Sequence, residues 1–189
     1  MKTLLLMRHA KSSWKDNKEK DRERPLNKRG RHDAPIMGQI LADRELVPQC
    51  ILSSSAERAR ETAEVIAKAS HYDGDVSYLD KLYMGEPEDY IEALRDLPNE
   101  VERVMVIGHN PGLEMLLQLM SGQIQSMPTA VIAHIVLPID HWSELSMNTS
   151  GEVVDIWRPK EIAEEIKEEK GKPKSKKTKP KEKPKKKDK

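Results

Sequence analysis

The chain has 189 residues, one cysteine and a net charge of +1 at pH 7. This length predicts one ordinary domain with some excess rather than two full domains. Cys50 alone cannot form an internal disulfide framework, and no apolar run approaches the ~20 residues of a membrane-spanning helix. The run Leu4 to Met7 is also too short for a signal peptide, so we expect a cytoplasmic protein without a transmembrane segment.

Charge is distributed unevenly along the chain. Residues 167–189 carry thirteen Lys against four Asp and Glu, whereas residues 1–166 hold 20 basic and 28 acidic residues. The last stretch, "GKPKSKKTKPKEKPKKKDK", has no apolar residue and cannot offset the entropy lost on ordering. We therefore expect a folded domain over residues 1–158, a short helical extension over 159–170 and a disordered Lys-rich tail over 171–189.

Apolar runs and helical stretches alternate through residues 1–158. In chain order, we expect a strand over 3–7, a helix over 28–44, a strand over 49–53, a helix over 56–68, a strand over 76–79, a helix over 88–97, a strand over 103–107, a helix from Pro111, and two strands within 129–139 and 151–159. This alternation is typical of an α/β fold, a three-layer sandwich whose mainly parallel sheet has helices on both faces. The two final runs are separated only by a loop, which predicts an antiparallel edge pair.

Basic and imidazole side chains follow three of the predicted strands. Arg8 and His9 end the first strand in "LLLMRHAKSSW". Arg58 follows the second strand in "SSSAERARETA", and His109 follows the fourth in "VIGHNPGLE". Because ligands of open α/β sheets bind beyond the carboxyl ends of the strands, we expect these four residues to share one site.

Two of these loops are predicted to begin helices. Ser54 stands three residues before Glu57, which predicts a capping box, and Asn110 before Pro111 predicts an N-cap and a first helical position. Backbone N–H groups at helix starts and guanidinium groups both bind phosphoryl oxygens. Imidazole is a good nucleophile near neutral pH, so the constellation predicts phosphoryl transfer without a metal or another cofactor.

The motifs "RHA", "SSSAERARETAE" and "GHNPG" after successive strands resemble the histidine phosphatase superfamily, which is phosphoglycerate mutase-like, and within it the SixA-like phosphohistidine phosphatases. The resemblance spans residues 1–158. It implies that His9 attacks phosphorus to form a phosphohistidine, that Arg8 and Arg58 hold the phosphoryl oxygens, and that His109 completes the pocket as a donor. The stretch "DRERPLNKRG" resembles the family's "RPLT-x-x-G", which implies that Arg24 reaches the same phosphate.

One departure from the family pattern concerns the general acid. Phosphomonoesterases of the superfamily usually have a Glu just after the third strand, and Lys81 occupies that position in "LDKLYMGEPEDY". The nearby carboxylates are better explained as solvated loop residues or helix N-terminal charges; they are Asp80, Glu86, Glu88 and Asp89. A phosphoramidate leaves with less proton transfer than an alkoxide, so the missing acid favours phosphohistidine or another N–P substrate.

Two other functions stay open from the sequence. A small-molecule phosphomonoesterase of the same superfamily would use these residues on a small phosphorylated substrate instead of a phosphorylated protein. Alternatively, the chain is a binding module whose basic tail contacts nucleic acid, an anionic membrane surface or an acidic partner, although the tail has no aromatic residue to stack on bases. The remaining histidines are expected to be ordinary packed or exposed residues; they are His32, His71, His134 and His141.

Overall fold

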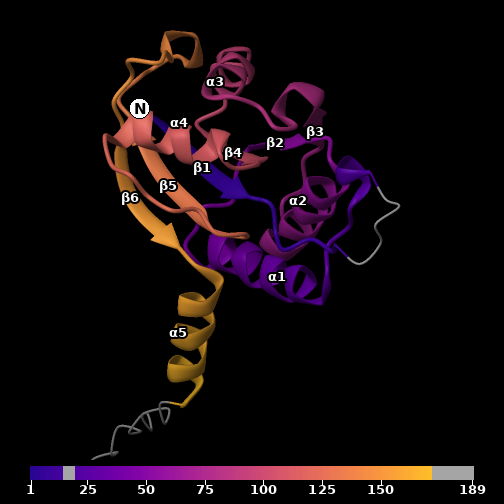
Figure 1. Ribbon diagram of the computed structural model, residues 1–189. Helices are drawn as coiled ribbons and strands as arrows, with labels where there is room; N and C mark the ends of the chain where they lie inside the picture. The colour runs from indigo at the N-terminus through magenta and orange to yellow at the C-terminus, as the bar shows by residue number, and fades with distance from the viewer. Residues whose placement is uncertain (15–19, 172–189) are drawn as a thin grey trace, which may run out of the picture.

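The computed structural model describes residues 1–14 and 20–171 of the chain (Figure 1). A six-stranded sheet with the strand order β3-β2-β4-β1-β5-β6 forms its centre. The strands are β1 (Lys2–Arg8), β2 (Cys50–Ser54), β3 (Val76–Leu79), β4 (Arg103–Gly108), β5 (Ile132–Leu137) and β6 (Glu152–Trp157). The first four pair in parallel, whereas β5 runs antiparallel to both β1 and β6. The predicted mainly parallel sheet with an antiparallel edge pair is confirmed.

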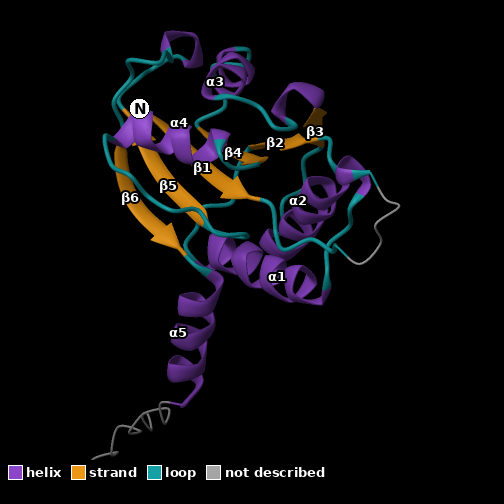
Figure 2. Ribbon diagram, in the orientation of Figure 1, coloured by secondary structure: helices purple, strands orange, loops and turns teal. Residues whose placement is uncertain are grey.

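The described residues form five helices: α1 (Lys28–Asp43), α2 (Glu57–Ser70), α3 (Pro87–Arg95), α4 (Gly112–Ser121) and α5 (Pro159–Gly171). Three short 3₁₀ turns connect them to strands and loops: η1 (Asp21–Glu23), η2 (Asp80–Leu82) and η3 (Trp142–Glu144). Figure 2 shows α1 and α2 on one face of the sheet and α3 and α4 on the other. The predicted three-layer α/β sandwich is therefore confirmed.

Strand β1 lies in the middle of the sheet and is buried on both faces, which explains its unbroken apolar sequence. Leu4 and Leu6 are fully buried in the apolar cluster that includes α3 and α4. Leu5 and Met7 are fully buried in the cluster that includes α1 and α2. Because alternate strand residues point to opposite faces, one short run serves both layers, and Arg8 is left at the end of the strand.

Helix α5 follows β6 and is anchored to the sheet domain by a buried side chain. Ile162 is 2 % exposed and belongs to the apolar cluster that includes Met37 of α1. Arg44, at the end of α1, lies 3.7 Å from the carboxylate of Glu165. The tail that we expect to be disordered lies, from residue 172 onward, outside the described residues. None of the helices within residues 1–14 and 20–171 has the length and apolar character that crossing a membrane requires.

Two predicted helix caps are wrong. Ser54 is the last residue of β2, and its hydroxyl accepts a hydrogen bond from the backbone N–H of Ala56 at 3.2 Å, so it is too far back along the chain to cap the turn at Glu57. The Asn110 side chain does not cap α4 either, because it donates to the carbonyl oxygen of Met127 at 3.0 Å. Both side chains form hydrogen bonds with loop residues beyond the strand ends instead of capping the helices.

Candidate active site

Strands β1, β2 and β4 end at the same edge of the sheet, and the loops that follow them surround a cavity of about 170 Å³. The structure brings all five predicted site residues together around this cavity: Arg8, His9, Arg24, Arg58 and His109. Further lining comes from Lys11, Ser12, Trp14, Met84, Asn110 and Thr129. The cavity is small and polar, so a compact anionic group fits it better than a large apolar ligand.

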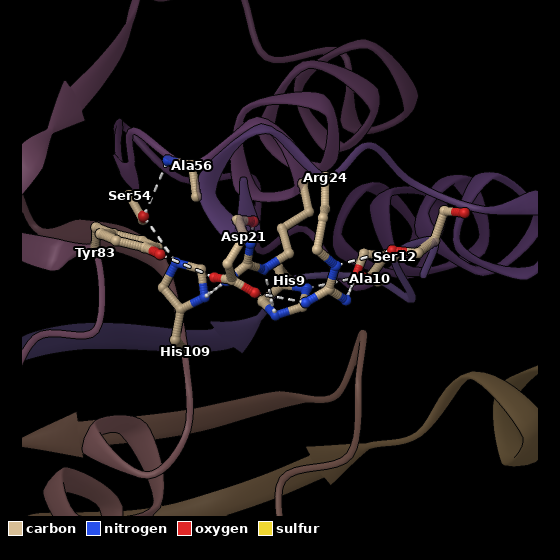
Figure 3. Close-up of polar contacts among 11 residues, drawn as sticks. His9, Ala10, Ser12, Asp21, Arg24, Ser54, Ala56, Tyr83 and His109 are labelled. Carbon is tan, nitrogen blue, oxygen red and sulfur yellow. Dashed lines mark hydrogen bonds and ion pairs between the residues drawn. The ribbon is translucent and has the colours of Figure 1, made fainter. Parts of the chain in front are cut away.

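His9 is 7 % exposed, and its contacts define its tautomer. Its Nδ1 lies 2.8 Å from the carbonyl oxygen of Ala10, which can only accept, so Nδ1 carries the proton (Figure 3). Arg58 donates from Nε to Nε2 of His9 at 3.3 Å, which requires a lone pair on Nε2. This is the lone pair that a nucleophilic imidazole uses.

His109 lies beside His9, with ring centroids 4.9 Å apart. Its Nδ1 lies 3.3 Å from Nη2 of Arg58, a group that only donates, so the ring proton is on Nε2. Nε2 donates to the hydroxyl of Ser54 at 2.7 Å, and the backbone N–H of His109 donates to the hydroxyl of Tyr90 at 3.2 Å. Two buried hydroxyl groups therefore hold the ring and the backbone of His109.

Both histidines are neutral at physiological pH. Burial lowers the pKa of His9 to about 3; it outweighs the hydrogen bond to Ala10, and the charges of Arg58 and Arg8 add to it. Burial also lowers the pKa of His109 to about 3, with His9 and Arg58 as further causes. Neutral His9 keeps its lone pair across the physiological range and needs no separate base to deprotonate it.

Three arginines bring positive charge to the cavity from different segments. Arg58 is 3 % exposed and Arg24 is 8 % exposed. Arg24 donates from Nη2 to the hydroxyl of Ser12 at 2.5 Å, and Arg8 donates from Nη1 to the carbonyl oxygen of Met127 at 3.1 Å. Such fixed guanidinium groups bind phosphoryl oxygens and stabilise the charge that develops during transfer.

Sequence reasoning missed Asp21 and Tyr83. Oδ1 of Asp21 accepts from Nη1 of Arg24 at 2.7 Å. Its Oδ2 accepts from Nη2 of Arg58 at 3.1 Å and from the Tyr83 hydroxyl at 2.8 Å (Figure 3). The sequence did contain a signal for Asp21: it stands three residues before Arg24, a spacing that allows an ion pair across a short turn. Tyr83 offered none, because its contact with Asp21 spans 62 residues of sequence.

Asp21 is ionised at neutral pH. Its burial would raise the pKa, but the hydrogen bonds from Tyr83 and Arg24 and the charge of Arg58 outweigh it and lower the pKa to about 2. This carboxylate therefore holds no proton to donate at physiological pH.

The carboxylates considered for the general acid have other partners. Asp80 pairs with Arg22 at the surface. Glu86 and Asp89 form the capping box of α3, and Glu88 is exposed in its first turn. Among the residues that the structure describes, no Asp or Glu lines the cavity.

Lys81, which stands where a Glu was expected, also points to another partner. Its Nζ lies 3.5 Å from the carboxylate of Glu92 on α3. Lys81 does not line the cavity, and neither do the histidines expected to be ordinary packed or exposed residues, which are His32, His71, His134 and His141.

Over residues 4–83, the sequence matches the profile of the histidine phosphatase superfamily (branch 1). It is 32 % identical over 152 residues to an uncharacterised chloroplastic protein of Arabidopsis thaliana, and the aligned region covers 75 % of this chain and 69 % of that protein. An uncharacterised protein of Mycobacterium tuberculosis is 30 % identical over 150 residues, covering 74 % of this chain and 91 % of that protein.

Solved structures with a similar fold include two SixA proteins. The proposed phosphohistidine phosphatase SixA from Agrobacterium tumefaciens superposes with a TM-score of 0.72 and 30 % identity, over 84 % of this chain and 98 % of that one. The protein histidine phosphatase SixA complexed with tungstate gives a TM-score of 0.73 at 23 % identity, over 85 % and 99 %, a likeness of fold alone. The chain therefore belongs to the histidine phosphatase superfamily, in its SixA-type branch.

Proposed function

We propose that this enzyme is a metal-independent phosphatase that uses His9 as its nucleophile, passes through a phosphohistidine intermediate and removes phosphoryl groups from nitrogen. One observation carries the proposal: a neutral, buried His9 has its lone pair on Nε2 at a cavity that three arginines also line. The arginines supply the positive charge that a metal ion supplies in other phosphoryl-transfer sites.

In the first step, Nε2 of His9 forms a bond to phosphorus while the bond from phosphorus to the leaving group breaks. The Nε–H of Arg58, which points to Nε2, turns to a phosphoryl oxygen and frees the lone pair. Arg8 and Arg24 bind the remaining oxygens. In the second step, the oxygen of a water molecule attacks phosphorus, the P–N bond breaks with its electron pair returning to Nε2, and the protons of that water leave with the phosphate as dihydrogen phosphate.

His109 changes its hydrogen-bonding role in this scheme. Without a phosphoryl group, its Nδ1 accepts a hydrogen bond from Arg58. The negative charge of a bound phosphoryl group raises the pKa of the ring, which favours uptake of a proton on Nδ1. His109 then donates to a phosphoryl oxygen, as the resemblance to the superfamily implies.

The substrate class follows from the leaving group. No carboxylate of the described residues lines the cavity, so none of these residues offers a carboxylic acid that would protonate an alkoxide. Imidazole and amine leaving groups need less proton transfer from the protein than an alkoxide does. A phosphorylated histidine on a protein is therefore the substrate that the site fits best.

A small phosphorylated metabolite is the second candidate, because the cavity would hold its phosphoryl group equally well. A polyanion contact through the Lys-rich tail concerns residues outside the described range and stays a prediction, as does the cytoplasmic location. Neither changes the chemistry proposed for His9.

The test compares rates on a phosphohistidine protein with rates on a panel of small phosphoesters, with and without EDTA and vanadate. We expect vanadate-sensitive, EDTA-insensitive turnover that is fastest on phosphohistidine, and none with His9→Ala. Faster turnover of an alkyl phosphoester would favour the metabolite phosphatase, and full activity of His9→Ala would overturn the proposed nucleophile.

A further inference from the structure

We propose that Asp21 is a positioning residue of the phosphate site, whose carboxylate bridges Arg24 and Arg58 and holds both guanidinium groups at the spacing a phosphoryl group needs. The proposal rests on the proposed phosphatase function. It assigns a role to a side chain that takes no part in bond making or breaking.

The bridge uses both oxygens of the carboxylate. Oδ1 accepts from Nη1 of Arg24 at 2.7 Å, and Oδ2 accepts from Nη2 of Arg58 at 3.1 Å. Arg58 also donates from Nη1 to the backbone carbonyl oxygen of Asp21 at 2.6 Å. Both the main chain and the side chain of Asp21 therefore hold Arg58, while the side chain holds Arg24 as well.

The two arginines need such a partner because they reach the cavity from separate segments. Arg24 follows η1, and Arg58 lies in the first turn of α2. Both are almost completely buried, so water screens the repulsion between their charges poorly. A carboxylate between them offsets this repulsion, and its two oxygens fix the separation of the guanidinium groups.

Tyr83 extends this network to the second histidine. Its hydroxyl donates to Oδ2 of Asp21 at 2.8 Å, and its ring meets the His109 ring edge-on, with centroids 5.6 Å apart. The side chain of Asp21 is thus held in its bridging position by hydrogen bonds from three side chains.

Two other roles for Asp21 fit the structure less well: a carboxylate that blocks the phosphate site, and a proton donor. Asp21 does not block the site, because Arg24 and Arg58 line the cavity but Asp21 does not, so its carboxylate lies outside the space where a ligand would bind. Each terminal guanidinium nitrogen carries two hydrogens, so the bridge leaves further donors for phosphate. A proton donor would also need a pKa near the operating pH, and that of Asp21 is about 2.

The test measures vanadate binding by calorimetry, and kcat and KM on an aryl phosphate, for the full chain and for Asp21→Ala. The matched control is Asp80→Ala, because Asp80 pairs with Arg22 and so ties the same 3₁₀ turn to the protein without touching Arg24 or Arg58. Arg24→Ala and the double variant Asp21→Ala/Arg24→Ala complete a double-mutant cycle.

We expect Asp21→Ala to weaken vanadate binding and lower kcat/KM by about 10- to 100-fold, the loss typical of a displaced catalytic group. Asp80→Ala should change both by less than about 2-fold, in line with the small worth of exposed ion pairs. In the Arg24→Ala background, removing Asp21 should cost clearly less than in the parent, because one of the two groups it positions is already gone.

Equal losses in Asp21→Ala and Asp80→Ala would show that only the tether of the turn matters and would overturn the bridging role. Strictly additive losses in the cycle, or unchanged vanadate binding in Asp21→Ala, would overturn it as well. A parent protein that neither binds vanadate nor hydrolyses the aryl phosphate would instead overturn the proposed phosphatase function, and the role of Asp21 with it.

Discussion

Replacing Ser54 by Ala tests how His109 is held. Ser54 is fully buried at the end of β2, and its hydroxyl oxygen accepts from two buried donors. These donors are the backbone N–H of Ala56 at 3.2 Å and Nε2–H of His109 at 2.7 Å. The substitution removes one oxygen atom and leaves both donors without their acceptor.

The size of the effect follows from these two contacts. A buried donor that loses its acceptor costs about 1–3 kcal/mol, so Ser54→Ala should lower the free energy of unfolding by about 2–6 kcal/mol. Activity should fall too, because the ring of His109 loses one of the two hydrogen bonds that hold its orientation. Ser53→Ala is the matched control: Ser53 is equally buried on the same strand, but its hydroxyl donates to the carbonyl oxygen of Ser54 at 3.0 Å. Loss of that donor should cost only about 0.5–1.5 kcal/mol.

Urea denaturation measures the free energy of unfolding of both variants, and turnover of an aryl phosphate at a temperature where both are folded measures activity. The expected result is a large loss of stability and activity in Ser54→Ala and a small loss in Ser53→Ala. Equal stability losses in the two variants would refute the reasoning, as would full activity of Ser54→Ala.

Three further predictions concern pH, the last helix and the leaving group. The pKa of His9 and of His109 is lowered from 6.5 to about 3 in the folded protein, so the unfolded chain binds more protons between these values. The free energy of unfolding should therefore be highest above pH 6.5 and fall as the pH drops toward 4. Urea denaturation at each pH measures it, and in a His9→Asn/His109→Asn variant the free energy of unfolding should vary less with pH. Ile162→Ala should lower the free energy of unfolding by about 2–5 kcal/mol, because the side chain is buried, whereas Ile124→Ala, at 85 % exposed, should change it by less than about 0.5 kcal/mol. Aryl phosphates should turn over about 10²–10⁴-fold faster than alkyl phosphates, the usual worth of general acid catalysis. Lys81→Glu should not raise the alkyl rate, since Lys81 pairs with Glu92 and does not line the cavity; an increase would show that residue 81 reaches the leaving group.

The fold class and most of the candidate site were predictable from sequence because they depend on local patterns. Short apolar runs buried on both faces predict parallel strands, and the carboxyl ends of such strands meet at one edge. The sequence alone therefore predicts that Arg8, His9, Arg58 and His109 surround one cavity. Arg24 could be identified as a site residue only because the stretch around it resembles a family motif.

The parts that could not be predicted depend on long-range contacts. The role of Ser54 follows from where β2 ends relative to His109, 55 residues away, so the capping pattern of the sequence was misleading. The contact of Tyr83 with Asp21 likewise joins distant segments. A short helix over residues 159–170 was predicted, but only the packed structure shows that Ile162 is covered by the sheet domain.

The central claim is that His9 carries the phosphoryl group between two half-reactions. The most direct measurement mixes the protein with a ³²P-labelled aryl phosphate, quenches it rapidly in base and locates the label by peptide mapping. We predict a base-stable, acid-labile label on His9 that disappears in His9→Ala. A label on another residue, or turnover of His9→Ala at the parent rate, would contradict the account.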